Sequence, residues 1–243
     1  MKSLKFLLVL ATLVSGVTTY LNAQPAMGNK QVLETRHQHI TTIAAFTAKG
    51  DLERLKGSLN EGLEAGLTIN EIKEVLVHLY AYCGFPRSLQ GINTFIAVLD
   101  ARKTKGISDK VGKEATPVKS VETRYQQGKK VLETLTGRPE AGPKTGYAAF
   151  SPEIEVFLKE HLFADLFTRD VLSYTDREVA TISALINLGG VEPMMRSHMG
   201  IALNLGLTEN QLQGMLSLTE AQVGKKEADS GRAVLKALLN EKK

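Results

Sequence analysis

Two ionisable side chains and one thiol lie close together in the stretch EVLVHLYAYCGFP, which begins at Glu74. Glu74 and His78 are four residues apart, so on a helix they share one face. There the carboxylate can orient the imidazole and raise its pKa, as a general acid or base requires. Cys83 is the single cysteine of the chain and lies just before a Gly-Phe-Pro break. A thiol near a helix N-terminus or a cationic histidine becomes nucleophilic, but cysteine is also among the most frequently buried residues. Both roles stay open.

Other histidines give weaker indications of a site. His37 and His39 have the spacing of metal ligands, but no further ligand cluster accompanies them in the sequence. We therefore expect a solvated N-terminal pair, and neither a metal nor an organic cofactor. His161 lies beside Lys159 and Glu160, which indicates a surface position.

The residues around this stretch predict helices. Leu52, Leu55 and Leu59 recur at three and four residues, the spacing of one helical face. Thr68 and Glu71 form a predicted capping box that opens a helix from Ile69 to about Tyr82. The Gly-Phe-Pro break ends that helix, and a further helix is expected from Arg87 to Arg102. No convincing alternating run is present, so the sequence predicts an all-α fold without strands.

An internal repeat organises these helices into two units. LEAGLTINEI from Leu63 matches LNLGLTENQL from Leu203 at a shift of 140 residues. Upstream, TIAAFTAKG from Thr42 matches TISALINLG from Thr181 at a shift of 139. We predict a first unit over residues 30–102, a solvated linker over 103–120, and a second unit over 121–243. The second unit carries an N-terminal extension of two helices, at about 121–135 and 152–167, separated by an exposed loop.

The first 23 residues have the layout of a secretory signal peptide, with a basic start, an apolar run and a small residue, Ala23, at the expected cleavage site. The apolar run is about half the roughly 20 residues that a membrane-spanning helix needs. We therefore expect export to the periplasm or beyond and no membrane association after cleavage. Removal of Lys2 and Lys5 lowers the formal charge from +4 to +2. No basic stripe with interleaved aromatic residues is present, so a nucleic-acid partner is not expected.

Three stretches together resemble the carboxymuconolactone decarboxylase family, which has the all-helical, alkylhydroperoxidase-D-like fold. They are GLEAGLTINEIKEVLVHLYAYCGFPRSLQGINTF, DLFTRDVLSYTDREVATISALINLGG and SHMGIALNLGLTENQL. With RYQQGKKVLETLTG they cover most of the chain beyond the leader, in the order of tandem two-unit members. The resemblance implies two fused alkylhydroperoxidase-D-like units and a homo-oligomer, for which fusion of two units favours a trimer.

The resemblance also selects site residues. His198 matches the family's histidine on the helix before the Gly-Leu-Thr turn, whereas Ser58 takes that place in the first unit. It further suggests that Arg177 or Glu178 lines the pocket or a subunit contact, although favourable interaction with the helix dipole explains Glu178 equally well. Each unit has candidate site residues at positions where the other unit has none. The first-unit residues Glu74, His78 and Cys83 correspond to Gly214, Leu218 and Val223.

The favoured function is that of a carboxymuconolactone-decarboxylase-like enzyme acting on a small organic acid or lactone. In that interpretation His198 or His78 moves the proton, Glu74 orients the histidine, and Cys83 lines the pocket. The redox branch of the fold uses a CxxC pair, which this chain lacks. Two alternatives remain: a single-cysteine peroxide reductase with Cys83 oxidised to a sulfenate, and a non-catalytic binding or scaffold protein.

Overall fold

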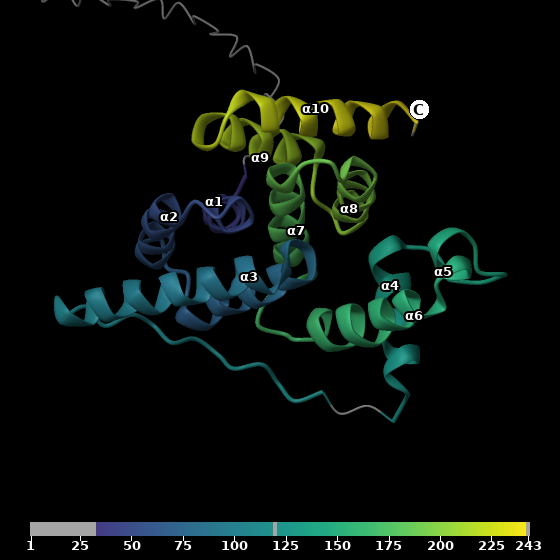
Figure 1. Cartoon of the computed structure of the whole chain (residues 1–243), viewed down its shortest axis with the longest axis horizontal. Coiled ribbons are helices and arrows are strands. Elements are labelled where there is room, and N and C mark those ends of the chain that lie inside the picture. Colours follow the sequence, from purple (N-terminus) through teal and green to yellow (C-terminus); the bar gives the residue numbers. More distant parts are fainter. Residues whose placement is uncertain (1–32, 119–120, 242–243) are drawn as a thin grey trace, which may run out of the picture. The chain divides into compact units, whose positions relative to one another are not determined.

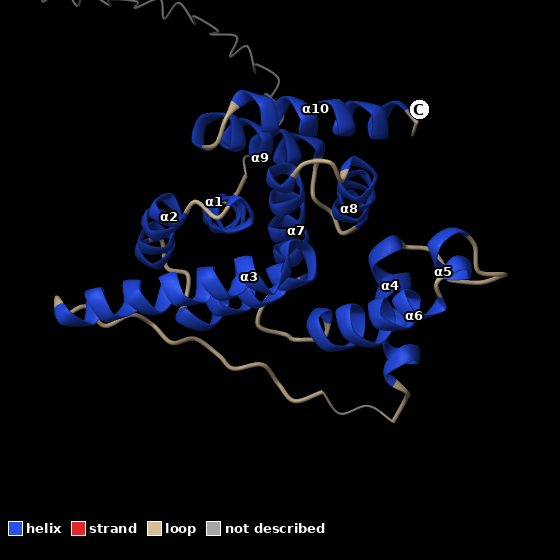
Figure 2. Ribbon diagram, viewed as in Figure 1, coloured by secondary structure: helices blue, strands red, loops and turns tan. Residues whose placement is uncertain are grey.

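The computed structural model describes residues 33–118 and 121–241 (Figure 1). Within these ranges every regular element is a helix (Figure 2), which confirms the predicted all-α fold. None of the helices there is long and apolar enough to cross a bilayer. The signal peptide predicted over residues 1–23 lies outside the described residues.

The helices follow the order expected from the repeat. The first unit contains α1 (Thr35–Lys49), α2 (Leu52–Glu64) and α3 (Ile69–Thr104). The second contains α7 (Tyr174–Leu188), α8 (Glu192–Asn204), α9 (Glu209–Gln222) and α10 (Lys225–Asn240). Between them lie α4 (Arg124–Thr136), α5 (Gly146–Phe150), α6 (Pro152–Phe157) and the π-helical segment η1 (Leu158–Phe167).

The two units correspond helix by helix. Helices α1 and α7 have 15 residues each, and α2 and α8 have 13 each. The last pair corresponds as well, because α3 is broken at Gly84 where α9 and α10 are separated at Gly224. Gly84 is non-helical inside α3 (φ 78°, ψ 162°), so α3 consists of two helices joined at a kink, as the Gly-Phe-Pro break predicts.

The turns before α3 and α9 repeat the same local chemistry. Thr68 and Glu71 form the predicted capping box, and Thr208 and Gln211 form its counterpart. In each box the threonine hydroxyl accepts from the N3 backbone N–H, and the N3 side chain accepts from the threonine N–H, so two donors of the first turn are satisfied. Gly66 and Gly206 precede these turns with φ of 96° and 97°, a conformation that favours glycine.

The units share one core rather than forming separate bodies. Helices α1 and α7 pack against each other, and their fully buried side chains include Ile40, Ile43, Val179 and Ile182. Residues 33–118 and 121–241 all belong to a single compact unit. Each unit therefore supplies the apolar surface that the other needs to bury.

The extension contributes a smaller second core, where α4 packs on η1 around Leu135 and Phe167. The two backbones approach so closely that a Cβ at Gly128 would lie 1.8 Å from the carbonyl oxygen of Lys159, so this helix contact requires glycine. Two local predictions were incomplete. The loop predicted between the extension helices contains the short helix α5, and the predicted 152–167 helix changes from α6 to the wider π-helical form of η1.

Residues 103–118 of the predicted 103–120 linker are mostly exposed, but the segment is attached to the start of α3. The backbone N–H groups of Ile69 and Asn70 donate to the carbonyls of Lys110 and Val111, both at 2.9 Å. These groups belong to the first turn of α3, where no partner within the helix exists. The linker thus caps the helix that carries Glu74 and His78.

Candidate active site

One face of α3 presents three polar side chains at intervals of four residues, Glu74, His78 and Tyr82. Glu74 and His78 are 3% and 0% exposed. The predicted common face is therefore present and lies inside the protein. Helix α7 packs against α3 and brings Arg177 and Thr181 to this face.

Two arginines bind the carboxylate of Glu74. Arg177 Nη2 donates to Glu74 Oε1 at 2.8 Å, and Arg169 Nε donates to the same oxygen at 2.8 Å. Arg177 is fully buried, and burial lowers its pKa against the opposing effect of Glu74. Sequence spacing predicts that Glu74 orients His78 directly. Among the described contacts, the carboxylate instead acts on His78 through Arg177.

His78 is held in one neutral state. Its Nδ1 lies 3.3 Å from Arg177 Nη1, which can only donate, so Nε2 carries the proton and donates to Thr181 Oγ1 at 2.9 Å. Burial, and then the charges of Arg177 and His198, lower the pKa of His78 well below its ordinary value. The expected rise in its pKa is wrong, because His78 is fully buried and, second, because the charge that acts on it is a guanidinium rather than a carboxylate. With both nitrogens engaged, His78 is poorly suited to move a proton.

His198 has the arrangement that His78 lacks. Its Nδ1 donates to Glu178 Oε2 at 2.8 Å, and Glu178 is completely buried. A capping box of Ser173 and Asp176 starts α7 just before Glu178, and α8 brings His198 against it. The His198 side chain remains 14% exposed. The carboxylate fixes the tautomer and leaves Nε2 free to take or give a proton.

Tyr82 lies between the two histidines. Its ring centroid is 5.2 Å from that of His78 and 5.3 Å from that of His198. Burial and then the charge of Glu178 raise the pKa of Tyr82 far above its ordinary value. The phenol therefore stays protonated and remains a donor.

Among the described residues, three buried polar atoms in this cluster have no hydrogen bond of good geometry, namely Tyr82 Oη, Arg177 Nε and Glu178 Oε1, although the Thr181 hydroxyl lies near enough to Tyr82 to lower its pKa. Their side chains are electrostatic neighbours, since Glu178 and Arg177 both act on the pKa of Tyr82. Buried polar groups are nearly always paired, and the exceptions often mark functional positions. Two donors and one acceptor beside the His198–Glu178 pair are thus left without a well-formed hydrogen bond in the described part of the chain.

Cys83 has a different environment. Its thiol donates to the carbonyl of Leu79 at 3.1 Å, and its side chain packs against the main core. Burial raises the pKa of Cys83 to about 11, against the weaker opposing effect of Arg87. The structure therefore groups Glu74, His78 and His198 around Tyr82 and Arg177, and gives the thiol a partner outside this group.

The N-terminal histidines are not a solvated pair as expected. His37 is buried, with its Nε2 3.3 Å from Asp176 Oδ1, because α1 packs along α7. Arg36 binds the same carboxylate at 2.9 Å. Across the described part of the chain, no group of three or more His, Cys, Asp or Glu side chains could hold a metal ion.

The protein is all-helical and consists of two fused units. Its buried polar centre is formed by side chains from α3 of the first unit and from α7 and α8 of the second. Residues 15–95 and 152–237 match the carboxymuconolactone decarboxylase family. The chain belongs to this family. The first match starts within the predicted leader, and residues 121–151 of the extension fall outside both matches. No curated protein matches the chain.

Proposed function

We propose that the chain is an exported carboxymuconolactone-decarboxylase-like enzyme that acts on a small organic acid or lactone. The observation that carries the proposal is the His198–Glu178 hydrogen bond of 2.8 Å beside three buried polar atoms that lack a well-formed hydrogen bond within the described residues. A histidine with one nitrogen fixed by a carboxylate and the other free is the arrangement that acid–base catalysis uses.

The roles follow from the donors and acceptors of the site. Tyr82 O–H and Arg177 Nε–H can donate to an oxygen of the substrate and stabilise negative charge that develops there. When the bond to the carboxylate carbon breaks, CO2 leaves and its electron pair forms an enolate. His198, protonated on both nitrogens, gives its Nε2 proton to the enolate carbon and regains a proton from water. Glu178 stabilises the imidazolium in between.

Turnover of a substrate panel tests the proposal. The panel contains 3-oxo acids and lactones that carry a carboxylate, and the measurement is released CO2 together with the proton-transfer product. We expect catalysis of at least one member above the uncatalysed rate. Binding of these compounds without any turnover would instead support the alternative of a non-catalytic binding protein.

The role of Cys83 gives a separate prediction. Because its pKa is about 11, little thiolate forms at neutral pH, and alkylation of the folded protein should be much slower than that of an exposed cysteine. Cys83→Ser should keep most of the turnover. Labelling is followed by mass spectrometry, with the unfolded protein as the control. Fast labelling together with peroxide-dependent loss of the thiol would favour the single-cysteine peroxide reductase.

Export is tested at the N-terminus. The basic lead, the apolar run and Ala23 support cleavage before Gln24. N-terminal sequencing of the protein from its native host should therefore give a start near Gln24. A protein that begins at Met1 and fractionates with the cytosol would contradict export and leave the proposed chemistry intact.

A further inference from the structure

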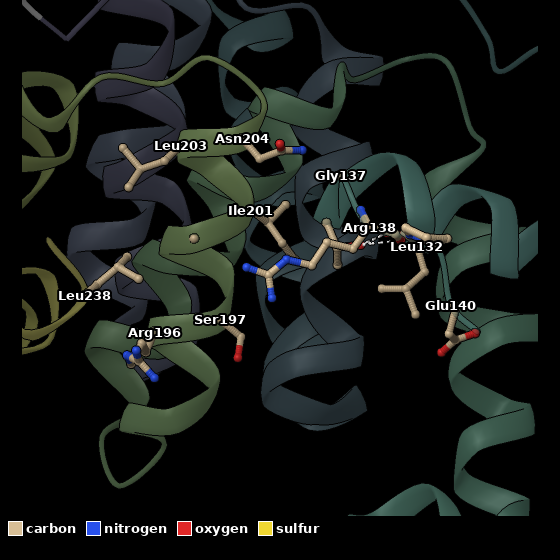
Figure 3. Close-up of a pocket in the computed structure, with 13 residues that line it drawn as sticks. Leu132, Gly137, Arg138, Glu140, Arg196, Ser197, Ile201, Leu203, Asn204 and Leu238 are labelled. Atoms are coloured by element: carbon tan, nitrogen blue, oxygen red, sulfur yellow. Dashed lines mark hydrogen bonds between the residues drawn. The ribbon is translucent and has the colours of Figure 1, made fainter. Parts of the chain in front are cut away.

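A groove lies on another face of α8, apart from the His198–Glu178 pair. It has a volume of about 660 Å³ and is formed by the end of α4, the loop after it, α8 and the end of α10 (Figure 3). Pockets for small ligands usually hold roughly 300–1,000 Å³. His198 is not among the lining residues, whereas its neighbour Ser197 is.

Aliphatic side chains form part of the groove wall. Leu132 comes from α4, Ile201 from α8 and Leu238 from α10, so three helices contribute aliphatic surface. Gly200 adds open space in the wall, because a Cβ there would first meet Leu238 Cδ1 at 4.0 Å. An apolar chain or ring of moderate size is the shape that such walls accept.

The charged residues of the groove leave positive charge available. Arg138 follows α4, and its side chain extends toward α8, where Ile201 and Ser197 lie (Figure 3). Its guanidinium has no ion pair within residues 33–118 and 121–241. Arg196 binds Glu241 through Nη2, but its Nε is buried without a partner. The acid of the groove, Glu140, is already paired with Lys159 at 2.6 Å.

We propose that this groove binds an amphipathic carboxylate, a small molecule with one carboxylate and an apolar chain or ring. The guanidinium of Arg138 presents a planar fork that matches a carboxylate. The apolar part lies on Leu132, Ile201 and Leu238. None of these residues is a polar group of the proposed catalytic centre, although Ile201 and Leu132 share a hydrophobic cluster with Tyr82.

Calorimetric titration of the protein with octanoate tests this site. We expect saturable binding of one octanoate per chain. Octanol lacks the charge, acetate lacks the apolar chain, and inorganic phosphate has charge without a chain, so each should bind at least about tenfold more weakly. Arg138→Ala should weaken octanoate binding by about tenfold or more. The control Arg54→Ala removes an arginine that pairs with Asp51 on α2 and should leave binding unchanged.

A second variant tests the apolar part without removing charge. Gly200→Leu places a side chain in the groove and replaces a helical glycine, so it should fold and abolish octanoate binding. The proposal is overturned if octanoate does not bind, if Arg138→Ala and Gly200→Leu both bind it like the unmodified protein, or if acetate or phosphate binds as tightly. If no member of the substrate panel is turned over, the proposed function fails, but the octanoate result still decides whether the groove binds a carboxylate.

Discussion

His198→Asn is expected to lower turnover by about 10²–10⁴-fold while the protein stays folded. The asparagine amide takes the place of Nδ1 and can still donate to Glu178 Oε2, so the completely buried carboxylate keeps a partner. It cannot, however, carry a proton to the reacting carbon. His198→Ala would be less informative, because it leaves that carboxylate buried and unpaired. Steady-state turnover and thermal unfolding of the same preparation give the two measurements.

The chain offers a matched control for this substitution. His161 also binds a carboxylate through Nδ1, with Asp165 Oδ2 at 2.9 Å, but its side chain is 54% exposed on η1. His161→Asn should keep both turnover and stability. Equal turnover in the two variants would contradict the assignment of proton transfer to His198.

Arg177→Met is expected to lower the free energy of unfolding by about 3–5 kcal/mol. The substitution removes a fully buried guanidinium and leaves Glu74, itself almost completely buried, with Arg169 alone. Arg169 is a weaker partner in this setting because its side chain is 40% exposed, so solvent screens the pair. Denaturant unfolding measures the change, provided that the slope of the transition stays constant.

Two further variants separate the ion pair from simple loss of packing. Arg169→Met should lower the free energy of unfolding by only about 1 kcal/mol, since exposed ion pairs contribute little. Glu74→Leu combined with Arg177→Met removes both buried charges and should recover much of the loss. If the double variant is as unstable as Arg177→Met, the unpaired carboxylate is not the cause.

Local chemistry made much of the fold predictable. The capping box at Thr68 and its counterpart at Thr208 depend on residues three apart, and the repeat relates the two without any knowledge of packing. The burial of His37 was not predictable in the same way. It depends on α1 lying along α7, a contact between residues about 140 apart in sequence. Nothing in the RHQH stretch indicates which helix covers it.

The site was predictable to a similar degree. The spacing of Glu74 and His78 correctly predicts one face, but the guanidinium that binds both comes from α7, 103 residues after Glu74. Glu178 was considered only through the family resemblance, since its partner His198 is on the next helix. Tyr82 could have been found from sequence, because it continues the interval of four from Glu74 through His78. Arg169 and Thr181 carry no such signal.

Helices α1 and α7 are corresponding helices of the two units and pack against each other. This arrangement bears on how many catalytic centres one chain can have. Two identical units related by twofold symmetry would form two equal centres, each with one histidine–carboxylate pair. In the repeat, the position of His198 corresponds to Ser58, and that of Tyr82 corresponds to Gln222. The second centre therefore lacks counterparts of His198 and Tyr82. We expect one reactive centre per polypeptide, with the corresponding position of the other unit reduced to packing.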